Sequence, residues 1–444
     1  MRWDLGAILK VLTGLLSVVM VTAAHGQSVD IRVQQIGVGG AFRTGEMTGM
    51  QVELSSRVAE PTPAFVQWEV TNPDGDIAEY GRSVTLTPNL PTNVWLYAPL
   101  LPSPHVDAGT VWTVRVLEQD DEAIGRELGV SRVSPSDVSH RLVPIRHGMI
   151  GVIGTSQQMG LGAYDVQNRL LDSPNGAHEY TQVVAGIAPN DLPDRWEALQ
   201  GFEAFVWGPG RDASPADLRV DPANSLREYI RRGGHLIIAL PEVGDDWSLG
   251  RADANELSDL LPENAPRLDE DVPVAELLPI LSKSRDVGAD DDDVRMAIRV
   301  FAEADGSFDA INNGYEPLLA LADGRIVGVQ RMYGFGRITL IGVDVASPRL
   351  AGLRYRLPHA DVLWNRVLGR RADAPTAVEI RALEDDEQLS AGRINSRLIE
   401  MPEMILGRLD MRRHAGIAVM LSLLVFTVYW LVAGPGGFFL LRQF

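Results

Sequence analysis

Cysteine is absent from this 444-residue chain, which excludes disulfides, thiolate metal sites and cysteine nucleophiles together. Basic charge is also scarce. The chain has 40 Lys and Arg residues against 59 Asp and Glu residues, and its formal net charge is −19. Such a chain repels the phosphate backbone of nucleic acids on average, so we expect no nucleic-acid partner.

Long hydrophobic runs are confined to the two ends of the chain. At the N-terminus, Arg2 and Lys10 precede an uncharged run over 11–21, and small residues follow as far as Gly26. This order of charged, apolar and small residues is typical of a secretory signal. The sequence therefore predicts a signal peptide over residues 1–26 and export of the mature chain.

The second hydrophobic run, at 415–441, carries no charge. Its first part would form roughly 27 Å of helix at ~1.5 Å per residue, which is enough to cross a bilayer. We expect a transmembrane helix and a short tail over 414–441, preceded by a juxtamembrane linker over 371–413. The expected location is the cell membrane, with a single pass and the bulk of the chain on the extracytoplasmic (periplasmic) side.

The chain as a whole is 45% hydrophobic by composition, and the body between its two ends is too long for a single core, so we expect a multidomain protein. Over residues 27–140, short runs with period-two alternation are separated by turn residues. In one of them Val66, Trp68 and Val70 share a face, and Trp112 lies in another. This rhythm predicts an antiparallel β-sandwich of immunoglobulin-like architecture.

Beyond His147 the pattern changes to short, continuous apolar runs, which are typical of parallel strands buried on both faces. Four such runs are predicted as strands, over 149–154, 180–185, 204–207 and 235–240.

The helix before the last of these runs carries clear end signals. Ser225 and Glu228 have the spacing of a capping box, and Gly233 is placed to end the helix. A hairpin is expected across 333–336 and a further helix over 359–368. Helix, glycine and buried strand together indicate an α/β unit over residues 145–370.

These features resemble the flavodoxin-like core of class I glutamine amidotransferase-like domains in bacterial membrane-anchored envelope proteins. The resemblance is carried by the segment 192–204, the helix ending at Gly233-Gly234, the hairpin 331–337 followed by Asp344, and the Gly434–Arg442 pattern. It implies a flavodoxin-like α/β fold for residues 145–370 and a membrane helix behind it.

The catalytic cysteine of that class is missing, however, and the turns 208–210 and 241–244 hold no serine in its place. We therefore expect no catalytic residue of the class, no enzymatic activity and no cofactor.

Two residues are candidates for a ligand-binding edge. Glu242 follows a predicted strand, at the carboxyl edge where α/β sheets place ligands, and it could also be an ordinary solvated carboxylate. Ser156 follows another predicted strand and could act as a nucleophile with His178 or His235, or cap the next helix.

Other patterns are less specific. Gly154, Gly160 and Gly162 lie where a phosphate-binding loop would be, but their spacing fits neither the dinucleotide nor the P-loop motif. The acidic runs 290–293 and 384–387 lack the alternation of a calcium loop, so we expect no metal site.

The sequence thus predicts a non-catalytic, membrane-anchored extracytoplasmic binding or scaffold protein of the cell envelope. Its expected partners are envelope proteins or wall components. The alternative is a hydrolase or small-ligand sensor that uses the carboxyl edge of the α/β sheet.

Overall fold

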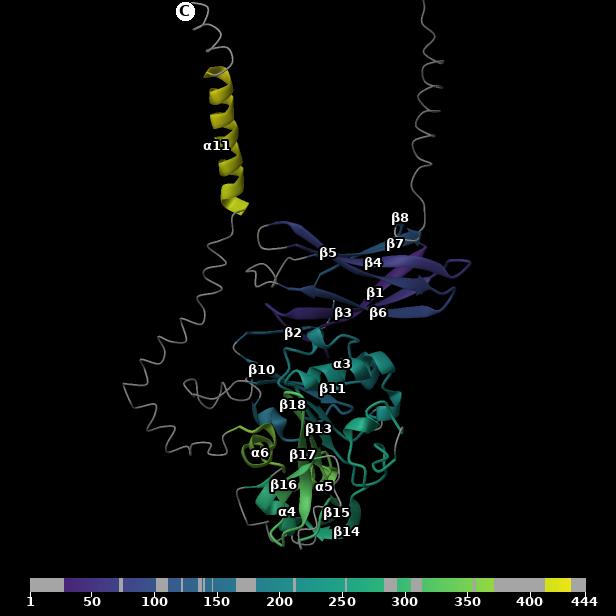
Figure 1. Ribbon diagram of the computed structural model, residues 1–444, viewed down its shortest axis with the longest axis vertical. Helices are drawn as coiled ribbons and strands as arrows, with labels where there is room; N and C mark the ends of the chain where they lie inside the picture. Colours follow the sequence, from purple (N-terminus) through teal and green to yellow (C-terminus); the bar gives the residue numbers. More distant parts are fainter. Residues whose placement is uncertain are drawn as a thin grey trace, which may run out of the picture.

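The computed structural model places the strands of the N-terminal part at one end of the molecule and a larger sheet with its helices below them (Figure 1). The structure describes residues 28–71, 75–100, 111–120, 123–134, 138, 140–145, 147–164, 181–210, 213–251, 254–282, 294–304, 314–353, 357–370 and 412–432. The predicted signal peptide (1–26), nearly all of the linker (371–413) and both acidic runs lie outside these residues.

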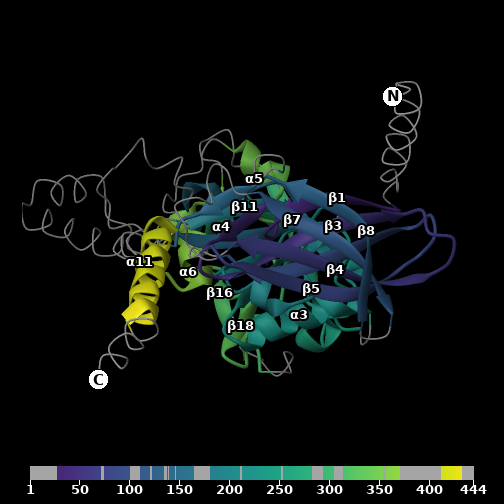
Figure 2. The same ribbon diagram turned by 90° about the horizontal axis from the view of Figure 1, so that it is seen from above.

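The N-terminal part consists of two antiparallel sheets, of strand order β1-β3-β6 and β5-β4-β7-β8. Viewed from above, these strands form the near layer, with α3 and β18 behind it (Figure 2). The strands are β1 (Val29–Ile36), β3 (Met47–Ser56), β4 (Thr62–Thr71), β5 (Ile77–Leu86), β6 (Pro91–Pro99), β7 (Trp112–Asp120) and β8 (Ala123–Val133).

The two sheets share one hydrophobic core. Val66, Trp68 and Val70 of β4 are all buried in it, which confirms the predicted face of that strand. The Trp68 ring meets Trp112 of β7 edge to face, with 5.7 Å between the ring centroids. Both rings come from the four-stranded sheet and belong to the core that the two sheets share.

The larger sheet has seven described strands, in the order β11-β10-β12-β13-β18-β17-β16. The first five are parallel and the last two are antiparallel to their neighbours. The strands are β10 (Gly148–Ile153), β11 (Thr181–Ile187), β12 (Ala204–Trp207), β13 (His235–Ala239), β16 (Glu316–Ala320), β17 (Ile326–Tyr333) and β18 (Gly336–Ile341). All five residues of β13 are buried, as its continuous apolar sequence predicted.

Helix α3 (Val220–Arg231) packs on this sheet and ends as the sequence predicted. The N–H of Gly233 donates to the carbonyl of Ile230 and that of Gly234 to Tyr229, the paired bonds of a Schellman stop. The predicted capping box is wrong. The helix begins five residues before Ser225, because Pro222 is tolerated in a first helical turn.

The remaining elements surround the larger sheet. A two-stranded arm, β14 (Arg267–Pro273) and β15 (Arg295–Val300), is inserted between β13 and β16 together with α4 (Val274–Leu281). The short helices are η2 (Leu161–Tyr164), η3 (Pro189–Asp191), η4 (Trp196–Ala198), η5 (Pro215–Asp217), η6 (Ser258–Leu260), α5 (Pro348–Gly352), η8 (Ala360–Trp364) and α6 (Asn365–Leu368). The last two confirm the helix predicted over 359–368.

The two parts of the molecule meet through a separate two-stranded sheet and a polar contact. Strand β2 (Ala41–Arg43) pairs in parallel with β9 (Arg141–Val143). Asp194 accepts hydrogen bonds from the Tyr97 hydroxyl at 2.5 Å and from Arg82 at 2.6 Å. Burial, together with the charge of Asp194, raises the pKa of Tyr97. The contact joins β5 and β6 to the segment between η3 and η4. The predicted domain boundaries at 140 and 145 stay predictions.

The predicted fold class is wrong as a whole. Strands dominate the described structure, helices are few and the sheets are several. A flavodoxin-like domain needs helices between successive parallel strands, but the segment between β11 and β12 forms only 3-10 turns among its described residues. Pro189 and Pro193 in that segment each lack a backbone donor and restrict the residue before them, which disfavours a continuous helix through 189–193.

The predicted membrane anchoring is also wrong. Within the described residues, no helix is both long enough and apolar enough to span a bilayer. Helix α11 (Arg412–Leu431) begins with two arginines, and residues 433–441 of the predicted span lie outside the described ones. The transmembrane helix predicted over 414–441, and the single-pass location with it, are overturned by this finding on the described residues.

Replacing Trp68 by Ala should lower the free energy of unfolding by about 3 to 5 kcal/mol, because it removes a fully buried ring from the shared core. Chemical denaturation of the full chain, monitored by far-UV circular dichroism, measures this loss. The control is Ile124→Ala on the edge strand β8, whose side chain is 54% exposed and should cost less than about 0.5 kcal/mol. Equal losses for the two variants would contradict the core assignment.

Candidate functional site

Glu242 lies directly beyond the carboxyl end of β13, where the sequence predicted it, but its carboxylate is already bound. Its Oε1 accepts hydrogen bonds from Arg349 at 2.7 Å and from the backbone N–H of Ala297 at 3.3 Å. Its Oε2 accepts one from the Ser347 hydroxyl at 3.3 Å. The side chain is only 15% exposed. Glu242 therefore ties the β13 loop to β15 and to α5.

Asp344, just beyond the end of β18, completes this arrangement. It accepts hydrogen bonds from the backbone N–H groups of Glu242 at 3.1 Å and of Ala346 at 3.0 Å. Burial raises the pKa of Asp344, in spite of these donors. The two carboxylates thus close the carboxyl end of the central strands with internal contacts, and we call this set the Glu242 cluster (Glu242, Ala297, Asp344, Ser347 and Arg349).

Ser156 is exposed in the loop after β10 and does not belong to this cluster. It does not cap the next helix either, since η2 begins only at Leu161. The neighbouring Thr155 instead forms a local turn, accepting a hydrogen bond from the N–H of Gln157 at 3.1 Å. Among the described residues no hydrogen bond joins Ser156 to the Glu242 cluster, although both lie beyond carboxyl ends of strands in the same parallel sheet.

The glycines of the same loop serve the packing of the chain. Gly154 and Gly160 both have φ +83°, a conformation that favours glycine. A Cβ on Gly160 would lie 2.3 Å from the carbonyl oxygen of Pro358. This close approach explains the glycine without a phosphate ligand.

Neither candidate histidine completes a triad in the described structure. His178 lies outside the described residues. His235 begins β13 and so lies at the opposite end of the parallel sheet from Ser156. Its Nε2 is 2.8 Å from the hydroxyl of Thr339. Burial, helped by the nearby charge of Arg337, lowers the pKa of His235 to about 3.

The described residues contain no group of three or more His, Asp or Glu side chains arranged to hold a metal ion. The acidic run at 290–293 is not among those residues.

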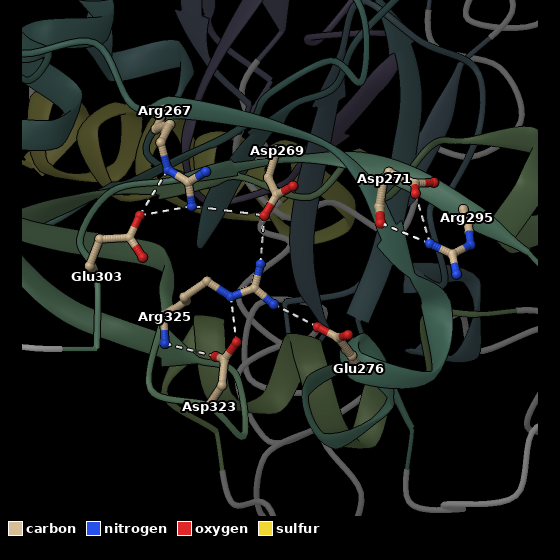
Figure 3. A network of polar contacts seen from close by, with 8 residues as sticks. All are labelled: Arg267, Asp269, Asp271, Glu276, Arg295, Glu303, Asp323 and Arg325. Atoms are coloured by element: carbon tan, nitrogen blue, oxygen red, sulfur yellow. Dashed lines mark hydrogen bonds and ion pairs between the residues drawn. The ribbon is translucent and has the colours of Figure 1, made fainter.

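A network of ion pairs lies on the β14–β15 arm, and the sequence reasoning did not find it. Figure 3 shows the Arg325 guanidinium between Asp269 at 2.7 Å, Glu276 at 2.6 Å and Asp323 at 2.5 Å. The Arg325 side chain is 14% exposed. Hydrogen bonds from Arg325 lower the pKa of Asp323, although its partial burial works in the other direction. This network links the arm and α4 to the turn before β17. It also covers most of the Arg325 side chain.

Exposed apolar side chains gather at the turn between β17 and β18. Phe335 is 88% exposed and Met332 is 67% exposed. The sequence predicted this hairpin but not the exposure of its turn. The signal was a phenylalanine between two glycines, Gly334 and Gly336, since a tight turn leaves such a side chain no core to enter.

Two hollows on the described surface involve neither Ser156 nor Glu242. One, of about 440 Å³, lies between β1 and β8 and is lined by residues 31–34, 131–133 and Val138. The other, of about 370 Å³, lies near the junction of the two parts and includes Arg43, His147 and Glu203. Both are open depressions and not enclosed pockets.

Comparison with known proteins gives no family. No family model and no curated protein matches the chain. Among solved structures, the alkylpurine DNA glycosylase AlkC from Pseudomonas fluorescens is 14% identical with a TM-score of 0.17, and the match covers 29% of this chain and 33% of that one. A CARDB domain from Pyrococcus furiosus is 11% identical with a TM-score of 0.16, over 26% of this chain and 90% of that one.

A third similar structure is a putative β-galactosidase from Bacteroides fragilis, 11% identical with a TM-score of 0.18, over 53% of this chain and 41% of that one. The chain spans about a third of the length of the glycosylase. Likeness at this level carries no argument about fold or function. The resemblance to amidotransferase-like domains stays a prediction.

Replacing His235 by Gln should remove an acid-dependent loss of stability. As the pH falls below about 6.5, an unfolded histidine takes up a proton, whereas the folded His235 stays neutral until about pH 3, so the free energy of unfolding falls across this window. Between pH 7 and 4 the contribution is on the order of 3 kcal/mol. Urea midpoints measured across that range for the wild type and the variant test this.

Thr339→Val is the matched control, because it removes the hydrogen-bond partner and keeps the histidine. This variant should shift the urea midpoints and leave their dependence on pH unchanged. If the profiles of the wild type and His235→Gln run parallel, the assignment of a buried neutral histidine is wrong.

Proposed function

We propose that this protein is a non-catalytic binding or scaffold protein. The observation that carries the proposal is the engagement of the Glu242 carboxylate. It stands at the edge where α/β sheets place ligands, yet it is bound by Arg349, Ser347 and the Ala297 N–H. A general base or ligand-binding carboxylate must reach its substrate, and this one would have to break an ion pair at 2.7 Å to do so.

The chemistry of the neighbouring loops supports the same proposal. The turn after β12 reads Gly208-Pro209-Gly210, and the turn after β13 contains Glu242 and Val243 between a proline and a glycine. Neither turn offers a hydroxyl or thiol nucleophile. Ser156, the nucleophile candidate of the sequence, forms no hydrogen bond to a histidine or a carboxylate among the described residues.

The partner is proposed to be a protein or a wall component of the cell envelope and not a nucleic acid. Because the chain has a net charge of −19, it repels phosphate backbones on average. A local surface patch whose charge or polarity differs from this average can still bind a protein.

The rival proposal is a hydrolase or small-ligand sensor that uses the carboxyl edge, with Ser156 and Glu242. It would require the Glu242 cluster to open on ligand binding. Enzymatic activity that depends on Glu242 or Ser156 would distinguish this alternative from the non-catalytic proposal.

The purified full chain should release no ammonia from glutamine and no p-nitrophenol from p-nitrophenyl acetate above the buffer rate, because the described part of the chain presents no positioned nucleophile. A coupled glutamate dehydrogenase assay and an absorbance assay measure the two rates. Glu242→Gln should lower the thermal midpoint, since it weakens the pair with Arg349, and should leave both rates at the buffer level. Turnover by the wild type that is lost in Glu242→Gln or in Ser156→Ala would overturn the non-catalytic proposal.

A further inference from the structure

The turn of the β17–β18 hairpin presents two large apolar side chains to solvent. Phe335 is 88% exposed and Met332 67% exposed. Exposing a phenylalanine forfeits about 1.5 to 3 kcal/mol of burial energy, so a side chain this exposed has no role in the core. We call residues 332–336 the hairpin tip.

The tip is held rigidly against the end of α3. The N–H of Phe335 donates to the carbonyl of Arg231 at 2.9 Å. Gly334 has φ +65°, and a Cβ on Gly336 would lie 2.0 Å from the carbonyl oxygen of Ile230, so the two backbones touch. Phe335 therefore projects from a fixed turn, and little conformational entropy is lost when it is bound.

Two arginines at the end of α3 lie beside the tip and give it a charge opposite to that of the whole chain. Arg231, in the last turn of α3, and Arg232, its C-cap, have side chains 70% and 53% exposed and share the single carboxylate of Glu228, at 3.9 and 2.6 Å. Arg331 is not counted with them, because its guanidinium donates to the carbonyl of Asp259 at 3.3 Å and lies 5.3 Å from the ring centroid of Tyr315. Two guanidinium groups against one carboxylate leave a positive excess here, on a chain of net charge −19.

We propose that the hairpin tip is the docking site for a partner protein whose surface carries an apolar pocket bordered by carboxylates. This inference deepens the binding function proposed above and rests on it. The Phe335 ring and the Met332 side chain would enter the pocket, while Arg231 would face the carboxylates at its rim. Aromatic residues, methionine and arginine are the types enriched in protein interfaces, and buried aromatic anchors dominate their energy.

Selection from a random twelve-residue peptide display library on the immobilised full chain tests the proposal. The selected peptides should combine apolar residues with Asp or Glu. Their affinity should fall about 30-fold or more with Phe335→Ser, as expected for a central anchor, and several-fold with Arg231→Ala. The Arg231→Ala loss should shrink at high salt, because the charges are exposed.

Val243→Ser is the matched control, since Val243 is 84% exposed but lies beside the Glu242 cluster at the other end of β13. It should leave peptide affinity unchanged, and all three variants should keep the wild-type thermal midpoint.

Two results would overturn the proposal. One is a set of selected peptides that bind Phe335→Ser as tightly as the wild type. The other is Phe335-dependent binding to vesicles containing phosphatidylserine with no Phe335-dependent peptide, which would make the tip a lipid-binding element. Failure of this test leaves the absence of turnover unaffected, whereas enzymatic turnover would leave peptide binding at the tip unaffected, so the two proposals fail separately.

Discussion

The parallel pairing of β13 with β18 is the interaction on which the rest of the larger sheet depends. It runs in register from the pair His235 and Arg337 to the pair Ala239 and Ile341. On one side of it lie the parallel strands β12, β10 and β11, and on the other the antiparallel strands β17 and β16. Because β13 is buried along its whole length, burial of apolar area fixes this pairing and positions whatever lies at its two ends.

The two ends of this pair have opposite characters. At the carboxyl end, Glu242 and Asp344 accept hydrogen bonds from groups of the chain itself. The edge that α/β proteins commonly use for ligands is therefore filled by internal contacts. At the amino end, the close contact between Gly336 and α3 fixes the hairpin tip and leaves Phe335 in solvent. The binding function and the docking site proposed above rest on this asymmetry between the two ends of the pair.

Local patterns predicted the strands well, because a continuous apolar run such as β13 allows few other structures. They failed where contacts between residues far apart in the sequence determine the structure. Glu242 was placed correctly at its edge, but Arg349 and the Ala297 N–H reach it from elements more than 50 residues away, which no local pattern shows. Ser225 had the spacing of a cap, yet the helix starts earlier and buries it. Uncharged composition likewise suggested a membrane-spanning helix, whereas the described C-terminal helix begins with two arginines and is not both long and apolar enough to span a bilayer.

Hydrogen–deuterium exchange of the full chain, with and without a saturating selected peptide, tests the asymmetry between the two ends most directly. The account predicts slower exchange in the hairpin tip and in the last turn of α3, around Arg231, with no change in residues 241–244. Slower exchange at 241–244, with the hairpin tip unchanged, would contradict it and would place recognition at the Glu242 cluster.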